Sequence, residues 1–220
     1  MMTAVQCWDD GVTNDVRLAE VCRRHGAVAT FNLNAGLNQP QRVFGWKYRD
    51  MDVTRLGWDE MREVYDGFTI ANHGLEHPRL EQLPVDEARH DIVEGRKRLQ
   101  DFFDQPVDGF VYPYGTFNDA VKQIIREAGH TYARATTYLD RPYPPDDPME
   151  FHPNCTFDAP DFWERYEAAR PGGVFYFWGH SYELCTEPMW EEYEERIRRI
   201  SADPESRWDT VASLFSGTTS

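Results

Sequence analysis

Short apolar runs alternate along this chain with segments whose apolar residues recur at helical spacing, and this alternation limits the fold more than any other feature. The apolar runs have the length and bulk of buried strands and cover residues 4–7, 27–31, 68–71, 109–112, 131–135 and 173–178. Helical segments stand between them, and Gly26 and Gly129 follow the ends of two of these segments. Because alternating strands and helices build parallel sheets with helical crossovers, the sequence predicts an α/β fold.

The chain has the size of one globular domain. Its 220 residues suffice for one large core and are too few for two comfortable ones. The sequence shows no internal repeat, linker or low-complexity segment, so we expect residues 1–220 to form a single domain. Residues 32–57 follow neither period, and we expect a long irregular loop there. Loops of this length inside compact domains are usually functional.

Charge and apolar content exclude several kinds of partner. The formal net charge of -15 disfavours nucleic acid and anionic membrane surfaces, because both bind basic patches. No apolar run approaches the roughly 18 residues of a membrane span, and no signal peptide is visible. The four cysteines are scattered without a C-x-x-C pair, which indicates reduced thiols. We therefore expect a cytoplasmic protein with no nucleic-acid or membrane partner; the sequence indicates no oligomeric state.

Polar residues stand where several of the predicted strands end. They are Asp9 and Asp10, His73 and His77, Tyr114, and His180. In folds built from alternating strands and helices, catalytic and binding residues gather at the carboxyl ends of the parallel strands. The positions of these residues therefore predict one shared site.

Each of the two densest motifs also has a simple structural interpretation. Residues 9–11 (DDG) have the composition of a polar turn, and the histidines in residues 73–77 (HGLEH) could lie on the surface. Zinc proteases place an H-x-x-x-H pair on a helix with Glu directly after the first His. Here that position is Gly74, and Pro78 ends any helix. This excludes the protease arrangement but not a metal site in a loop.

Together the two motifs supply the residues of a hydrolytic metal site. A catalytic zinc keeps three protein ligands and an open position for water. His73, His77 and one of the two aspartates fill those three positions. The other aspartate is then free to take a proton from water that the metal has activated. The residues alone leave open which aspartate has which role.

Four segments resemble, in order and spacing, the motifs of the polysaccharide deacetylase (NodB-homology) family. They are residues 8–11 (WDDG), 72–77 (NHGLEH), 112–115 (YPYG) and 179–180 (GH). The resemblance spans roughly residues 5–184, most of the chain. It implies that residues 1–220 are one catalytic domain of this type, with a distorted (β/α) barrel of about seven parallel strands, which agrees with the alternation described above.

The resemblance also implies the metal ligands. Asp10, His73 and His77 would hold a divalent ion, most often zinc in this family and in some members cobalt or nickel. The cofactor expected from the resemblance is therefore Zn²⁺, with Co²⁺ or Ni²⁺ as alternatives.

Three further residues receive catalytic roles from the same resemblance. Asp9 would be the general base, and the backbone N–H of Tyr114 would face the developing oxyanion. His180 would be the general acid that protonates the leaving amine. The alternative for His180 is a histidine in an ordinary turn at the end of a strand.

The chain departs from the family pattern at two motifs. The third motif usually begins with an arginine that orients the base, and Val111 stands there instead. Arg134 is the best substitute, because an arginine at the barrel mouth could pair with Asp9; an ordinary surface ion pair is the equal alternative. The fourth motif, an Asp and Trp pair, has only a loose counterpart in Asp158 and Trp163. Asp158 is equally well interpreted as a helix N-cap.

The leading hypothesis is a metal-dependent hydrolase that removes acetyl groups from an N-acetylated, or O-acetylated, carbohydrate. One alternative is hydrolysis of another non-peptide C–N bond, such as a cyclic amide. A second is a non-catalytic carbohydrate-binding relative, which would need neither base nor acid. Tyr112, Trp178, Tyr182 and Trp46 are candidates for stacking on sugar rings, the alternative for each being burial in the core.

Overall fold

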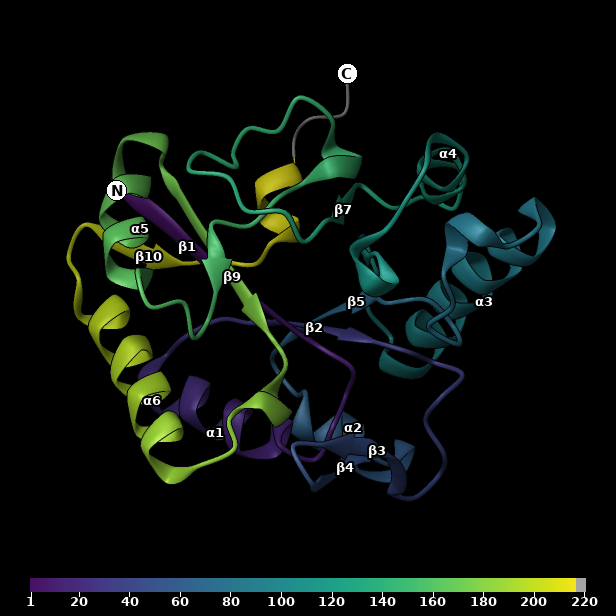
Figure 1. Ribbon diagram of the computed structural model, residues 1–220, viewed down its shortest axis with the longest axis horizontal. Coiled ribbons are helices and arrows are strands. Elements are labelled where there is room, and N and C mark those ends of the chain that lie inside the picture. Colours follow the sequence, from purple (N-terminus) through teal and green to yellow (C-terminus); the bar gives the residue numbers. More distant parts are fainter. Residues whose placement is uncertain (217–220) are drawn as a thin grey trace.

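A sheet of parallel strands forms the centre of the molecule (Figure 1). The computed structural model describes residues 1–216. Neighbouring strands follow the order β7, β6, β5, β2, β1, β9, β8, and each pair is parallel. Their bounds are β1 Met2–Asp9, β2 Thr30–Leu33, β5 Thr69–Asn72, β6 Gly109–Val111, β7 Tyr132–Arg134, β8 Cys155–Thr156 and β9 Val174–Gly179. A further strand, β10 (Ser206–Trp208), pairs with the first residues of β1.

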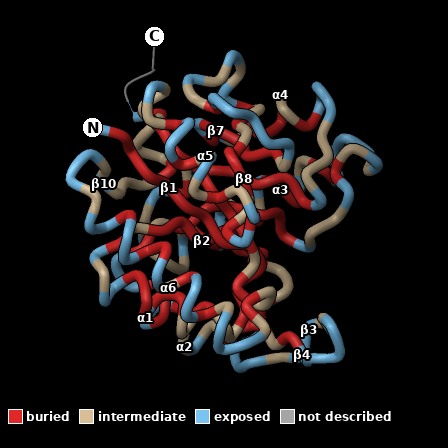
Figure 2. The backbone as a smooth tube through the Cα atoms, turned by 60° about the vertical axis from the view of Figure 1, so that its left-hand side comes forward, coloured by how far each residue is buried: buried red, intermediate tan, exposed pale blue. Residues whose placement is uncertain are grey.

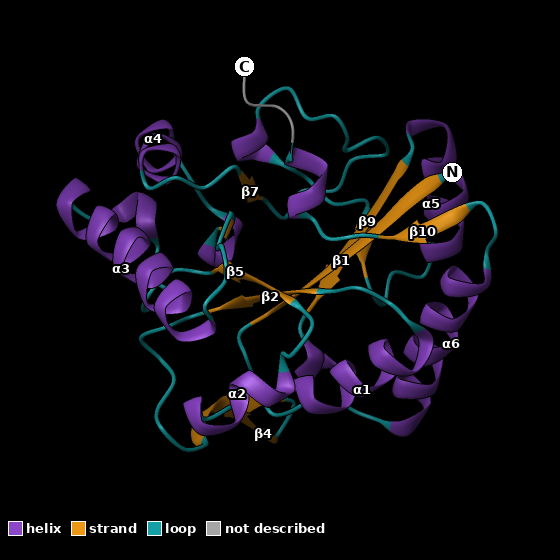
Figure 3. Ribbon diagram, turned by 180° about the vertical axis from the view of Figure 1, so that it is seen from behind, coloured by secondary structure: helices purple, strands orange, loops and turns teal. Residues whose placement is uncertain are grey.

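Helices surround this sheet (Figure 3). They are α1 Asp15–His25, α2 Trp58–Val64, α3 Val85–Phe103, α4 Asp119–Glu127, α5 Phe162–Ala169 and α6 Glu187–Ala202. Within residues 1–216, none of the helices has the length and apolar character needed to cross a membrane.

The sheet curls into a barrel that a short extended segment nearly closes. Phe151 donates its N–H to the Ala133 carbonyl oxygen at 2.9 Å and forms a bridge with Arg134 on β7. Three residues later, Asn154 donates its N–H to the Tyr176 carbonyl oxygen at 2.7 Å on β9. The two ends of the sheet are thus joined through residues 151–156. The predicted distorted (β/α) barrel of about seven parallel strands is confirmed.

The prediction of an irregular loop over residues 32–57 is wrong in one respect. Two strands there, β3 (Val43–Tyr48) and β4 (Met51–Arg55), pair as an antiparallel hairpin outside the barrel. In Figure 2 the hairpin protrudes, mostly exposed, from the buried centre. Its turn consists of Arg49 and Asp50, both with positive φ. Without the Asn-Gly or Asp-Gly pair that such turns favour, the sequence carries no clear hairpin signal.

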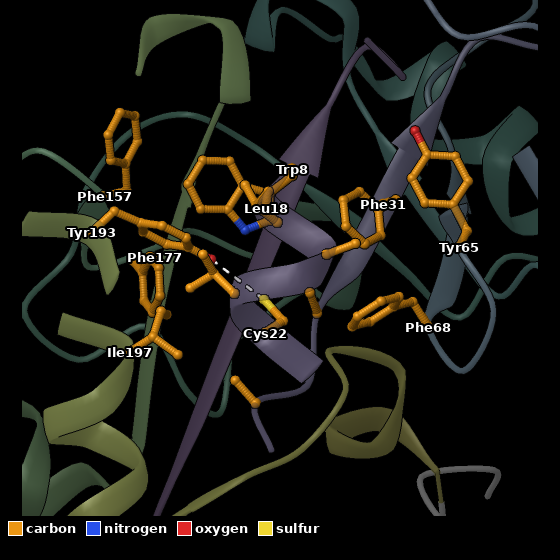
Figure 4. Packing of buried hydrophobic residues seen from close by; sticks show 14 of the residues in the cluster. Trp8, Leu18, Cys22, Phe31, Tyr65, Phe68, Phe157, Phe177, Tyr193 and Ile197 are labelled. Carbon is orange, nitrogen blue, oxygen red and sulfur yellow. Dashed lines mark hydrogen bonds between the residues drawn. The ribbon is translucent and has the colours of Figure 1, made fainter. Parts of the chain in front are cut away.

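The alternation of side chains along β1 decides which residues reach the barrel interior. Trp8 points outward, where it packs with residues of α1 and α6 in the largest core cluster (Figure 4). Val5 and Cys7 belong to the cluster with Tyr132 and Tyr176, which come from β7 and β9. Because neighbouring side chains of a strand point to opposite faces, Asp9 continues the row of Val5 and Cys7 toward the inside of the barrel.

A buried carboxyl group on α1 connects two other parts of the structure. Asp15 accepts a hydrogen bond from the Tyr65 hydroxyl at 2.7 Å and one from the Ser181 hydroxyl. Its side chain is fully buried, and this burial raises its pKa to about 7. Asp15 therefore ties the end of α2 to the turn that follows β9.

Replacing Asp15 by Asn should change how stability depends on pH. The unfolded carboxyl titrates near 3.8 and the folded one near 7, so the wild-type free energy of unfolding falls as pH rises between these values. Asp15→Asn removes that component, and its stability relative to wild type should rise by roughly 2–4 kcal/mol from pH 4 to pH 8. Urea denaturation at the two pH values measures this. Asp86→Asn, at an exposed carboxyl, is the control; identical pH dependence in wild type and Asp15→Asn would contradict the prediction.

Candidate active site

The two adjacent aspartates at the end of β1 line the same cavity. In a regular strand their side chains would point to opposite faces. Asp10 has a φ of 83°, so the strand ends there and the alternation is broken. The Arg55 guanidinium, from β4, donates to the Asp10 carbonyl oxygen at 2.6 Å and holds this turn.

Asp9 is buried in a set of groups that keep it ionised. One carboxylate oxygen accepts a hydrogen bond from Asn32 at 2.6 Å, and the other accepts one from Arg134. Burial alone would raise the pKa of Asp9, but Arg134, followed by His73 and His180, outweighs it and lowers the pKa to about 2. Asp9 is therefore a carboxylate at any physiological pH.

Arg134 comes from the strand next to the one on which the family arginine is expected. The register of β6 and β7 sets Val111 directly beside Arg134. Arg134 is 1% exposed, and its guanidinium lies 4.1 Å from the centre of the Trp178 ring. The structure thus gives Asp9 an arginine partner that reaches it from β7.

A side chain of α3 holds the loop that carries both histidines. Asp91 accepts hydrogen bonds from the backbone N–H groups of Leu75 and Glu76, both at 2.9 Å. Gly74, with a φ of 78°, allows this approach, because a Cβ there would lie 2.6 Å from an Asp91 oxygen. The loop after β5 is therefore fixed by the buried Asp91 carboxyl group, which lies outside the sequence motifs.

The three predicted metal ligands lie close together: they are Asp10, His73 and His77. Their ligand atoms all lie within 4.8 Å of one another, and the two histidine Nε2 atoms are 3.1 Å apart. His73 Nδ1 lies 2.9 Å from the Val111 carbonyl oxygen, which leaves Nε2 free to act as a ligand. Burial lowers the pKa of both histidines, that of His77 to about 4, so both rings are neutral at pH 7. One carboxylate and two neutral imidazoles are the donor set of a divalent metal site.

His180 follows β9 and faces both aspartates. Its Nε2 lies 3.9 Å from an oxygen of Asp9 and 3.9 Å from an oxygen of Asp10. On the other side of the ring, Nδ1 lies 3.3 Å from Glu183, which also accepts the His180 backbone N–H at 3.2 Å. Burial opposes protonation, but Glu183 and the two aspartates prevail and raise the His180 pKa to about 9.

The residues predicted to bind the metal or to act in catalysis all line one cavity of about 540 Å³. Tyr114 lies at its rim, 55% exposed, with its ring 4.6 Å from that of His77. The lining residues are Asp9, Asp10, Trp46, Arg55, His73, His77, Tyr112, Tyr114, Gly115, Arg134, Thr136, Trp178, His180 and Tyr182. Asp158 instead lines a separate hollow, and α5 begins at Phe162 with Asp161 at the N-cap position, so Asp158 is not its cap.

Asn32, Arg55 and Glu183 are site residues that the sequence did not reveal. Asn32 is the last-but-one residue of β2, and its position at a strand end was the one available signal. Arg55 reaches the site through the hairpin, whose existence was not predicted. Glu183 acts three residues after His180, in a short 3₁₀ turn without a sequence signature.

The fold and this cluster define a parallel (β/α)-barrel protein with carboxylates and histidines gathered at the mouth. Residues 2–133 match the family model for polysaccharide deacetylase, and the chain belongs to this family. No curated protein sequence matches the chain.

Three solved structures share the fold. A peptidoglycan N-acetylglucosamine deacetylase, Bc1960, is 15% identical with a TM-score of 0.62, covering 97% of this chain and 88% of its own. A family 4 esterase domain of a xylanase from the hindgut metagenome of Trinervitermes trinervoides is 14% identical, with a TM-score of 0.60 and coverages of 98% and 90%. The Streptococcus pyogenes deacetylase PplD, in complex with acetate, is 20% identical with a TM-score of 0.56; the match covers 66% of this chain and 61% of PplD.

Removing Arg134 should destabilise the fold far more than removing an exposed arginine. Arg134→Met leaves Asp9 buried without its pair, and we expect a loss of about 3–5 kcal/mol at pH 7. Arg89→Met, which breaks a half-exposed pair with Glu127, should cost less than about 1 kcal/mol. Chemical denaturation measures both. The double variant Asp9→Asn/Arg134→Met should lose less than Arg134→Met alone; an equal or larger loss would show that the charge pair is not the cause.

Proposed function

We propose that this protein is a metal-dependent hydrolase that removes acetyl groups from an N-acetylated, or O-acetylated, carbohydrate. The observation that carries the proposal is the convergence of Asp10, His73 and His77 beside a second carboxylate, Asp9, that is held separately. Membership of the polysaccharide deacetylase family supports it. So do the relatives of the same fold, one of which is named for N-acetylglucosamine deacetylation and another of which holds acetate.

The donor set supports zinc as the metal, with cobalt or nickel as alternatives, because imidazole and carboxylate ligands suit these ions. Asp10, His73 and His77 would hold it. A bound divalent cation would polarise the acyl carbonyl and lower the pKa of water toward neutrality.

Asp9 is proposed to accept the proton of the attacking water. Its pKa of about 2 makes it a weak base, so it requires a water more acidic than bulk water, which fits a cation site beside it. Asn32 and Arg134 hold its two oxygens, so the carboxylate is oriented before the substrate arrives.

His180 is proposed to donate the proton that the leaving amine needs. Its raised pKa keeps the ring protonated at pH 7, and the Glu183 carboxylate lies 3.3 Å from its Nδ1 on the opposite side. The backbone N–H of Tyr114 would donate to the oxyanion of the tetrahedral intermediate. Breaking the C–N bond then yields acetate and a free amine.

Hydrolysis of a cyclic amide is the second candidate. A cavity of about 540 Å³ has the size of a small-molecule site, and a ring amide would fit it as well as a sugar does. Acetate is produced only by the first reaction, whereas ring opening yields a single amino acid product, so product analysis separates the two. A purely carbohydrate-binding role is disfavoured, because binding alone needs neither the ionised Asp9 nor the protonated His180.

Substitutions of the two aspartates should have different effects on metal content and on turnover. Asp10→Ala should lose stoichiometric zinc and activity together, whereas Asp9→Asn should keep the metal and lose at least about 100-fold in acetate release. Elemental analysis gives the metal content. Acetate release is measured on N-acetylglucosamine, chitooligosaccharides and acetylxylan, with and without added zinc or cobalt.

Asp86→Asn, at an exposed position of α3, is the matched control and should change neither quantity. A wild-type protein that binds no stoichiometric metal, or full activity in Asp9→Asn, would contradict the proposed roles.

A further inference from the structure

The hairpin β3–β4 is built onto the loop that carries Asp10. Val12 forms a bridge with Arg55, and the Thr13 N–H donates to the Thr54 carbonyl oxygen at 2.8 Å. Arg55, at the end of β4, also donates to the Asp10 carbonyl oxygen. The base of the hairpin is therefore fixed to the backbone of the site itself.

The inner face of the same hairpin packs on the turn that carries His180. The rings of Trp46 and Tyr48 both meet the ring of Tyr182 edge to face, with centroids 5.2 and 5.1 Å apart. Tyr182 in turn lies 5.0 Å from the His180 ring, inclined by 33°. The hairpin thus connects two sides of the cavity mouth, the loop after β1 and the turn after β9.

Trp46 is the residue of this hairpin best placed to meet a ligand. It is half-buried and lines the cavity, and the Arg55 guanidinium lies 5.0 Å from its ring centre. Arg55 and Tyr182 therefore fix the indole without removing it from the cavity. Phe44, on the same strand, is 58% exposed and does not line the cavity.

The cavity is partly open to solvent, and the hairpin forms one of its walls. Its lining comes from the carboxyl ends of β1, β5, β6, β7 and β9 and from the hairpin that follows β2. Among the described residues, none of those between β8 and α5 (157–161) lines it. A volume of about 540 Å³ is in the range of small-molecule sites, and the hairpin limits how far a longer chain can extend on its side.

We propose that the hairpin is a specificity element: Trp46 packs on the apolar C–H face of the sugar ring, and the hairpin closes this side of the cavity. The sugar that loses its acetyl group is then the terminal residue of a short saccharide. This proposal rests on the proposed function, because it names the form of substrate for the same site.

The test compares the wild type, Trp46→Ala, Trp46→Phe and Phe44→Ala. Acetate release is measured on N-acetylglucosamine and on its β-1,4-linked dimer, trimer and hexamer. We expect wild-type kcat/KM to reach its maximum by the dimer or trimer. Trp46→Ala should raise KM about tenfold with little change in kcat, and Trp46→Phe should recover most of the loss. Phe44→Ala is the control and should match the wild type. Efficiency that keeps rising to the hexamer, or an unchanged KM in Trp46→Ala, would overturn the proposal.

Binding separates failure of this proposal from failure of the proposed function. Titration calorimetry with the dimer is carried out on Asp9→Asn and on Asp9→Asn/Trp46→Ala. If no acetate appears from any sugar but the dimer binds about tenfold more weakly to the double variant, the deacetylase function fails and the role of Trp46 in sugar binding stands. If acetate is released but Trp46 affects neither KM nor binding, the function stands and this proposal fails.

Discussion

The buried pair between Asp9 and Arg134 is the interaction on which the rest of the site depends. β1 and β7 are separated by four steps along the sheet, and in a flat sheet these steps would place them about 19 Å apart. The hydrogen bond between the two side chains exists only because the sheet curls into a barrel. The pair therefore links the curvature of the sheet to the position and charge of the carboxylate. A change that opened the barrel near residues 151–156 would separate the Asp9 carboxylate from Arg134.

The backbone of the site is held in a conformation that its residues do not favour. Asp10, His77 and Tyr114 all have positive φ, with values of 83°, 54° and 59°, and none of them is glycine. Such positions cost on the order of 1–3 kcal/mol each and persist only where the surroundings impose them. Arg55 imposes the turn at Asp10, and Asp91 holds the loop that leads to His77. This strained backbone is what allows side chains from several strands to meet at one point.

The sequence predicted the barrel and the grouping of the principal site residues, because both follow from periodicity and from the geometry of parallel strands. Asp9, Asp10, His73, His77, Arg134 and His180 all stand at strand ends and all line one cavity. Periodicity gave no sign of β8 and β10, with two and three residues each, or of the hairpin with its unusual turn. Asn32, Arg55 and Glu183 contact Asp9, Asp10 and His180, respectively. These contacts depend on the curl of the sheet, on the hairpin or on the short turn after β9, and periodicity indicates neither the hairpin nor the turn. Which aspartate binds metal and which takes a proton remains a prediction.

The place of Arg134 has a consequence for how relatives of this chain are compared. What position 111 supplies to the site is a carbonyl oxygen for His73, and any amino acid can supply that. Because the guanidinium of Arg134 reaches Asp9 from the neighbouring register position on β7, the Asp9 contact does not need the side chain at position 111. An alignment inspected column by column would record a missing arginine and would classify the protein as defective. In space Arg134 stands only one strand away from Val111, so the location of a group in the fold is a better guide to its role here than its column in an alignment.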